Sequence, residues 1–264
     1  MMKILKILGI VSLSMYSLFA VAEFEEDVLL VMRDNTEMMR STEEKVLVTM
    51  ELINKRGKTR EREMVYYMKG NTEEMRDSLV RFLSPADIKG TGLLTYEHKV
   101  GADDRWLYLP GLRRERRLAS SDQQDSFMGS DFSYEDMTLI FIDDFKYKII
   151  GEDTINGEPC WLVESLHSTE EGQKDSGYSK QIFYINKAHR YTMGVDYYNK
   201  KHDKFKQMRV TNVAYFDQVK KWRPTEQVME NLKTGHKTRL IYRDYQFNEA
   251  VPEDFLTIRE LRNG

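Results

Sequence analysis

From residue 44 to residue 247, the chain consists mainly of short segments with strand character, separated by tight turns. Arg56-Gly57 and Asn156-Gly157 mark two of these turns, and an Asn-Gly pair is among the strongest hairpin signals. A sheet of ten or eleven such strands tends to curl on itself. The sequence therefore predicts a mainly β protein with one curled antiparallel sheet. The strand regions are residues 44–70, 76–85, 92–100, 104–120, 144–166, 179–187, 190–200, 204–216, 222–232 and 237–247.

Helical signals are confined to three short segments, at residues 23–35, after Ser133 and at residues 252–261. Acidic residues open the first segment, where the helix dipole favours anions. Ser133 can cap the second, because Asp136 follows three residues later as in a capping box. Four apolar residues share one face of the first segment: Phe24, Val28, Val31 and Met32.

The N-terminus predicts a secretory signal peptide over residues 1–22. Lys3 and Lys6 give it a positive start. An apolar run follows, which ends in the small-residue cleavage site Ala20-Val21-Ala22. That run is shorter than the roughly 20 residues that a membrane span needs. We expect cleavage after Ala22, export of the protein, and a single domain over residues 23–264.

The composition of the exported part limits its function and its means of stabilisation. Removing Lys3 and Lys6 from the 40 basic residues leaves 38 against 43 acidic ones, a net charge of −5. This balance argues against binding nucleic acid, which needs a basic face. Cys160 is the only cysteine, so the protein must rely on its core and not on internal disulfides. We expect Cys160 itself to be a small buried apolar residue.

Several predicted strands are apolar on both faces, unlike those of a sheet that is solvated on one side. Either another element covers the second face, or one face lines an apolar cavity. Twelve of the 15 methionines lie beyond residue 22, and methionine packs adaptably at irregular apolar surfaces. Ordinary core packing is the simpler explanation for their number. In residues 46–53, Val46, Val48, Met50 and Leu52 alternate with Leu47 and Ile53.

The stretch "SFMGSDFSYEDMT", residues 126–138, combines hydroxyls and carboxylates with aromatic and methionine side chains. Its acids could serve acid–base catalysis, so a hydrolase that uses Asp131, Glu135 and Asp136 is one alternative. The five histidines are scattered singly, and no nucleophile elbow or phosphate-binding glycine motif occurs. We therefore expect no catalytic residue, no metal and no cofactor.

We interpret this stretch as a loop that leads into a short helix and forms a lid. In this interpretation Gly129 permits the turn, Ser133 caps the helix and the acids favour its first turn. The aromatic and methionine side chains would then face an apolar cavity. The predicted turn and cap residues are Gly129, Ser130, Asp131, Ser133 and Asp136.

The sequence "GLRRERRL" contains a cluster of arginines. In a strand, Arg113, Glu115 and Arg117 would share one face, and Arg114 and Arg116 the other. One interpretation is a solvated hairpin with ion pairs across the strands. The other is a surface that docks an acidic partner or lipid head groups.

Three motifs in succession, "FLSPADIKGTGLLTYE", "DRWLYLPGLRRERRLASS" and "SFMGSDFSYEDM", give the chain a family resemblance. The chain resembles the LolA-like outer-membrane lipoprotein-sorting proteins, in the branch often found beside RND-type exporters. The resemblance is strongest over residues 82–138 and extends more loosely over most of the chain. It implies a half-open β-barrel whose concave face is covered by a short helical lid.

The resemblance also implies a periplasmic carrier that holds the acyl chains of a lipid or lipoprotein, touches membranes transiently and works with an inner-membrane RND-type transporter. One alternative is an accessory protein of an exporter that binds no lipid, and a periplasmic hydrolase is another. The candidate cavity residues are Met50, Leu52, Trp106, Tyr108, Phe127, Met128, Phe132 and Met137. The candidates for partner docking are Arg113, Arg114, Arg116 and Arg117.

Overall fold

The computed structural model describes residues 28–40, 42–71, 75–248, 251–252 and 254–263. The predicted signal peptide, its cleavage site and Phe24 lie outside this part of the chain. Within it, none of the helices has the length and apolar character needed to cross a membrane.

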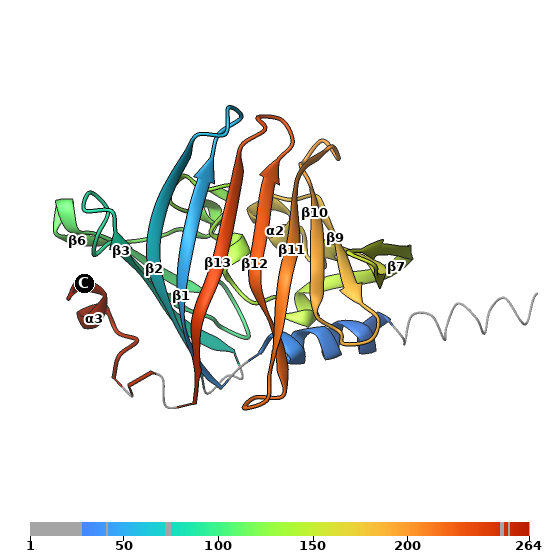
Figure 1. Ribbon diagram of the computed structural model, residues 1–264, viewed down its shortest axis with the longest axis horizontal. Helices are drawn as coiled ribbons and strands as arrows, with labels where there is room; N and C mark the ends of the chain where they lie inside the picture. The colour runs from blue at the N-terminus through green and yellow to red at the C-terminus, as the bar shows by residue number, and fades with distance from the viewer. Residues whose placement is uncertain (1–27, 41, 72–74, 249–250, 253, 264) are drawn as a thin grey trace, which may run out of the picture.

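Thirteen strands form one continuous antiparallel sheet (Figure 1). Neighbouring strands follow the order β6-β5-β4-β3-β2-β1-β13-β12-β11-β10-β9-β8-β7. Their bounds are β1 Glu43–Ile53, β2 Thr59–Gly70, β3 Arg76–Ser84, β4 Gly92–Tyr96, β5 Asp104–Leu109, β6 Arg114–Arg117, β7 Phe145–Ile155, β8 Glu158–His167, β9 Lys180–Asn186, β10 Thr192–Tyr198, β11 Lys204–Phe216, β12 Lys221–Asn231 and β13 Lys237–Phe247.

The strand order consists of two meanders that meet where β1 pairs with β13. Strands β6 and β7 are therefore the two edges of the sheet, although they are consecutive in the chain. The prediction of a curled antiparallel sheet is confirmed, but ten or eleven strands was too low a number. Three of the ten predicted regions each contain a hairpin of two strands: residues 44–70, 104–120 and 144–166.

Both predicted hairpin turns are confirmed. Gly57 has a φ of +77° in the β1–β2 turn, a conformation that glycine adopts without steric cost. In the β7–β8 turn, Asn156 and Gly157 have φ values of +52° and +83°. Positive φ at both central positions is the geometry that the Asn-Gly pair favours.

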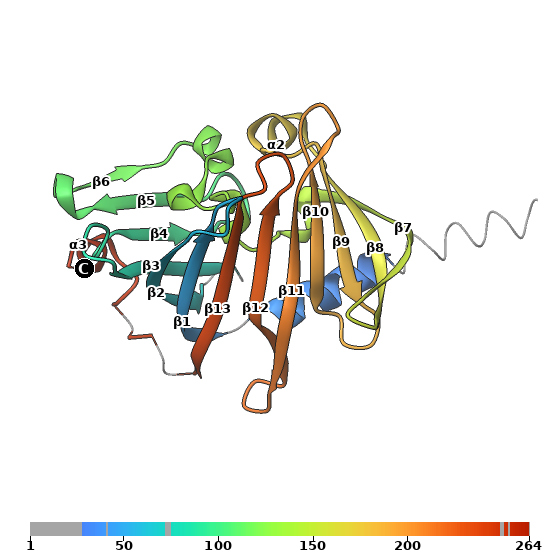
Figure 2. The ribbon, with the colours of Figure 1, turned by 45° about the horizontal axis from the view of Figure 1, so that its top comes forward.

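Helical elements are short, and most lie against the sheet. An α-helix over residues 28–39 lies behind strands β9–β11 in Figures 1 and 2. The connection from β6 to β7, residues 118–144, crosses the same concave side of the sheet, and we call it the lid. The other helical elements are η1 Pro110–Leu112, η2 Ser120–Gln124, η3 Phe127–Gly129, η4 Glu135–Met137, η5 Ile142–Asp144, α2 Glu170–Asp175 and α3 Ile258–Arg262.

The main core lies between the concave face of the sheet, the 28–39 helix and the lid. The helix contributes Val28, Val31 and Met32, as its periodicity predicted. Strand β1 contributes alternate side chains that are at most 2% exposed, namely Val46, Val48, Met50 and Leu52.

A smaller core covers the opposite face of strands β3 to β5. There α3 inserts Leu261 against Leu79 and Leu94. Gly92 permits this approach, because a Cβ at that position would lie 2.7 Å from Cδ1 of Leu261. For these three strands, the first of the two alternatives holds, because α3 covers their second face.

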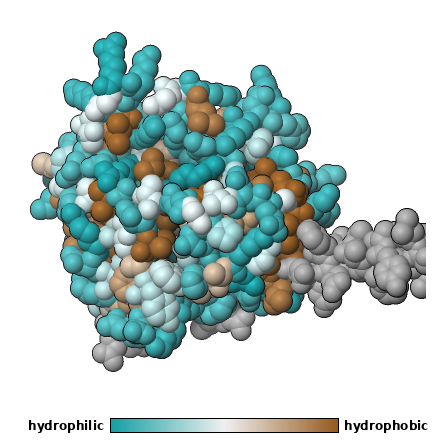
Figure 3. Space-filling view, turned by 45° about the vertical axis from the view of Figure 1, so that its right-hand side comes forward, coloured by the Kyte–Doolittle hydropathy of each residue, from teal (hydrophilic) through white to brown (hydrophobic). Residues whose placement is uncertain are grey.

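Apolar side chains also reach the surface. Leu29 and Leu30 on the 28–39 helix are 43% and 56% exposed. Figure 3 shows that apolar groups on this side of the molecule form separate patches within a mostly polar surface.

Cys160 is fully buried in a third apolar cluster with Tyr191 and Met193. Burial raises the pKa of its thiol, which leaves it less nucleophilic. We therefore expect a thiol reagent such as DTNB to leave the native protein unmodified, and to label one thiol per chain after denaturation in urea. Rapid stoichiometric labelling of the native protein would contradict the buried position.

Candidate functional site

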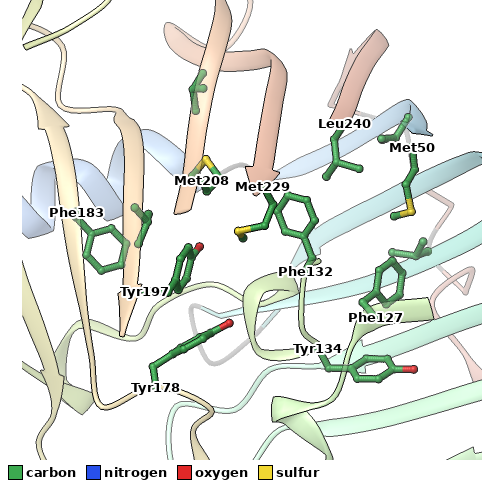
Figure 4. Close-up of a cluster of buried hydrophobic side chains, with 14 of the residues drawn as sticks. Met50, Phe127, Phe132, Tyr134, Tyr178, Phe183, Tyr197, Met208, Met229 and Leu240 are labelled. Carbon is green, nitrogen blue, oxygen red and sulfur yellow. The ribbon is translucent and has the colours of Figure 1, made fainter. Parts of the chain in front are cut away.

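A cavity of about 220 Å³ lies between the concave face of the sheet and the lid. Its walls come from strands in both meanders, the end of the 28–39 helix and the second half of the lid. The apolar and aromatic residues that line it are Met39, Val46, Val48, Met64, Tyr66, Met68, Phe132, Met137, Leu139, Tyr197, Met208, Pro224, Leu240, Tyr242 and Tyr245. Figure 4 shows Phe132 of the lid next to Met229, among side chains that project from the sheet.

Most polar groups in the cavity wall have partners within the protein, and among those described Nε of Arg76 is an exception. Tyr66 Oη donates a hydrogen bond to the carbonyl of Met137 at 2.9 Å, which ties the sheet to the lid. Tyr245 Oη donates to the carbonyl of Pro224 at 2.7 Å. Burial raises the pKa of Tyr242, so this phenol stays neutral. The wall therefore offers mainly apolar surface to a ligand.

Six of the eight predicted cavity residues lie in or against the concave core, but only Phe132 and Met137 line the cavity itself. Phe127 is fully buried beside Phe82, with ring centroids 5.9 Å apart. Met128 is half-buried. Met50, Leu52, Phe127 and Met128 therefore fill the barrel beside the cavity.

The prediction that Trp106 and Tyr108 line the cavity is wrong. Both pack in the smaller core under α3, whereas Leu107 between them belongs to the main core. Successive side chains of a strand point to opposite faces, so the register of β5 decides which of them face the cavity. The large aromatic side chains of this strand serve the outer face.

The lid begins its turn where the sequence predicts. Gly129 has a φ of +73°, and Met128 before it also has a positive φ. The backbone N–H of Ser133 donates to Oδ2 of Asp136 at 2.8 Å, and the N–H of Asp136 donates to Oγ of Ser133 at 3.3 Å. These are the two bonds of a capping box, but they enclose the single 3-10 turn η4 and not an α-helix. The lid is helical only in short turns.

Polar contacts fasten the lid to the meander that contains β8 to β13. Asp131 Oδ2 lies 2.6 Å from Nδ1 of His236 and accepts a hydrogen bond from Oγ1 of Thr238 at 2.8 Å. Asp136 forms a buried ion pair with Lys206, with Nζ 2.8 Å from Oδ2. These partners are separated from the lid by 105, 107 and 70 residues, so sequence spacing did not indicate them.

Tyr178 completes this network. Its hydroxyl lies 2.9 Å from Oδ1 of Asp136 and 3.0 Å from Oγ of Ser133. Burial, and next the negative charge of Asp136, hold the pKa of Tyr178 well above its usual value. The phenol therefore stays protonated and can donate to the carboxylate.

The three acids of residues 126–138, which lie in the middle of the lid, are occupied by structural contacts. Glu135 accepts hydrogen bonds from Oγ of Ser176 and from the backbone N–H of Gly177, the latter at 2.9 Å. The other two, Asp131 and Asp136, hold the contacts described above. In the described part of the chain, no group of three or more His, Cys, Asp and Glu side chains could hold a metal ion. This arrangement favours the interpretation that the acids fix the lid.

The arginine cluster sits at the edge of the sheet and forms ion pairs. Arg117 pairs with Asp104, Arg116 lies 3.6 Å from Asp122, and Arg262 of α3 pairs with Glu115. Arg113 lies in the turn before β6, where its φ is +50°. The ion pairs of the hairpin interpretation are therefore present. Docking of a partner by Arg113, Arg114, Arg116 and Arg117 stays a prediction.

The fold and the lidded apolar cavity define a class of half-barrel proteins, and comparisons with known proteins place the chain within it. A family model described only as "Uncharacterized protein" matches residues 74–263. No curated protein matches the sequence.

Several solved structures are similar to this chain over most of its length. An outer membrane lipoprotein-sorting protein domain from Vibrio parahaemolyticus is 28% identical, with a TM-score of 0.83 over 90% of this chain and 99% of that one. A DUF1329 family protein from Desulfovibrio piger is 26% identical, with a TM-score of 0.80 over 88% and 96%. A LolA superfamily protein from Nitrosomonas europaea shares the fold at 19% identity, with a TM-score of 0.68 over 87% and 96%. The chain therefore belongs to the family whose model matches residues 74–263, and it is similar to outer-membrane lipoprotein-sorting proteins with the LolA-like fold.

Proposed function

We propose that this protein is a periplasmic carrier that holds the acyl chains of a lipid or lipoprotein inside its half-barrel. The observation that carries the proposal is the apolar cavity between the curled sheet and a lid fastened by polar contacts. The similarity to lipoprotein-sorting proteins supports it.

The energetics of such cargo require a cavity of this kind. Each methylene moved out of water contributes about 0.8 kcal/mol, so one long acyl chain gains roughly 10 kcal/mol or more before other terms are counted. A carrier must offer apolar walls to match this gain, yet must also release the chain. Adaptable walls rich in methionine, such as Met64, Met68 and Met208, suit both needs.

The size of the cavity indicates that the lid moves when cargo enters. Ligand pockets usually enclose about 300–1,000 Å³, whereas this one encloses about 220 Å³. Phe132 and Met137 of the lid form part of its wall, so a shift of these two side chains would enlarge it. The lid is held by polar contacts and by buried side chains such as Phe127 and Phe132, so its opening exposes apolar surface that an entering acyl chain would cover.

The first 22 residues support export of the protein, and the motifs over residues 82–138 support its work with a transporter. The protein would be exported and cleaved after Ala22. It would touch membranes transiently while it exchanges cargo with an inner-membrane transporter of the RND type, and it would act without catalysis.

One observation favours a second candidate function, that of an exporter accessory which binds no lipid. Phe127, Met50 and Leu52 already fill part of the concave side, each at most 2% exposed. If the lid never moves, the barrel would be filled by its own side chains and could serve only as a protein-binding surface.

A larger side chain on the lid, placed so that it fills the cavity, distinguishes a lipid carrier from an accessory protein that binds no lipid. We expect Met137→Trp to weaken binding of a fluorescent fatty acid by roughly tenfold or more, because the larger ring occupies the space that the chain needs. Titration of the purified protein would measure the change. The matched control is Met128→Trp, the same substitution on the same lid at a residue that does not line the cavity. Equal affinity in the wild type, the variant and the control would contradict an acyl chain in this cavity.

A further inference from the structure

A second pocket, of about 530 Å³, lies beside the lid and shares one wall with the apolar cavity. That wall is Phe132, which lines both. The rest of this pocket is formed by the lid, by the segment between α2 and β9, by the adjoining ends of β11 and β12, and by the turns that join β10 to β11 and β12 to β13. It is lined by Gln124, Ser126, Ser130, Asp131, Phe132, Ser133, Gly177, Tyr178, Asn199, Lys200, Lys201, Phe205, Lys206, Asn231 and Lys233.

Positive charge dominates this pocket. Four lysines line it, against the single carboxylate Asp131. Asp131 is held by His236, and Lys206 is paired with Asp136. Among the residues that the structure describes, Lys200, Lys201 and Lys233 make no ion pair with a carboxylate. Three of the four lysines are therefore not paired with an acid in this part of the chain.

The surroundings of these lysines suit an anion. Lys200 Nζ donates to the backbone carbonyls of Gln173 and Tyr178, and its partial burial lowers its pKa. The ammonium of Lys233 lies 5.8 Å from the ring centroid of Phe205. An ammonium group binds phosphate as a compact point charge, and an anion in the pocket would relieve the repulsion between these cations.

We propose that this basic pocket binds the phosphate of an anionic lipid head group while an acyl chain of the same lipid occupies the apolar cavity. The inference rests on the proposed carrier function and names its cargo class. Among the described residues, only Phe132 lines both pockets, so it would stand where the head group meets the chain. The polar residues of "SFMGSDFSYEDMT" would then face the head group, and Phe132 and Met137 the chain.

The test compares two lipids that differ only in the head group. We expect the wild-type protein to bind dioleoyl phosphatidylglycerol roughly tenfold or more tightly than dioleoylglycerol, which has the same chains and no phosphate. The double variant Lys201→Gln, Lys233→Gln should lose this preference and keep its affinity for dioleoylglycerol. Both lysines are exposed at turns, so the variant should fold, which circular dichroism would check.

A matched control variant has the same net charge as the double variant of the pocket. Lys146→Gln, Lys148→Gln removes two exposed charges from the edge strand β7, outside the pocket, and should keep the preference. Equal affinity for both lipids in the wild type, or equal losses in both double variants, would overturn the head-group site and leave the carrier function standing. Inorganic phosphate bound through Lys201 and Lys233, without a preference for the phospholipid, would overturn it too. Failure to take up either lipid would contradict both proposals.

Discussion

Replacing Asp136 with Asn should lower the free energy of unfolding by about 3–5 kcal/mol, because it removes one charge from a buried ion pair. The side chains of Asp136 and Lys206 are 3% and 6% exposed. Without the carboxylate, the ammonium of Lys206 would remain buried without a counter-charge. The ring centroids of Tyr178 and Tyr197 lie 4.8 Å from Nζ of Lys206. Neither phenol can ionise to replace the lost charge, because burial raises the pKa of both. Urea denaturation would measure the change.

Two further variants make this prediction specific. Asp217→Asn removes the partner of Lys220 in an ion pair at the surface and should change stability by at most about 1 kcal/mol. Combining Asp136→Asn with Lys206→Met removes both charges and should recover much of the loss. A loss below about 1 kcal/mol for Asp136→Asn alone would show that this pair does not hold the lid.

Replacing Arg223 with Met should have an effect of similar size at another part of the cavity wall. Arg223 and Glu44 form a buried ion pair at 2.9 Å, with side chains 3% and 5% exposed. The guanidinium also donates to the carbonyl of Met38 at 2.7 Å, which ties the 28–39 helix to β12. Its loss leaves a buried carboxylate unpaired, so we expect the free energy of unfolding to fall by about 3–5 kcal/mol.

The control for this second variant is an arginine of the same sheet with much greater exposure. Arg239 pairs with Glu226 and Glu51 while its own side chain is 37% exposed. Arg239→Met should therefore cost about 0–1 kcal/mol in the same urea titration. Adding Glu44→Gln to Arg223→Met should recover part of the loss. Equal effects of the two arginine substitutions would contradict the role assigned to the buried pair.

The fold could be predicted because its signals are local. Each hairpin turn has its own residues, such as Asn156-Gly157, and each strand its own alternation. The capping bonds between Ser133 and Asp136 were also predictable, since they span three residues. These features depend little on the rest of the chain.

The parts of the site that could not be predicted depend on register and on distant pairing. A shift of one residue decides whether Leu107 or Trp106 faces the main core, and the sequence does not fix it. The partners of the lid acids, His236 and Lys206, come close only when the second meander folds back beside the first. The basic pocket has the same origin, since its lysines come from strand β11 and from two different turns.

The central claim is that the half-barrel carries lipid, and its most direct test is the protein's content when it is isolated from the periplasm. Organic extraction followed by mass spectrometry should release lipid in stoichiometric amounts, with phosphate-bearing lipids enriched. Protein that is free of lipid, and that also fails to take up a fluorescent fatty acid, would contradict the carrier function.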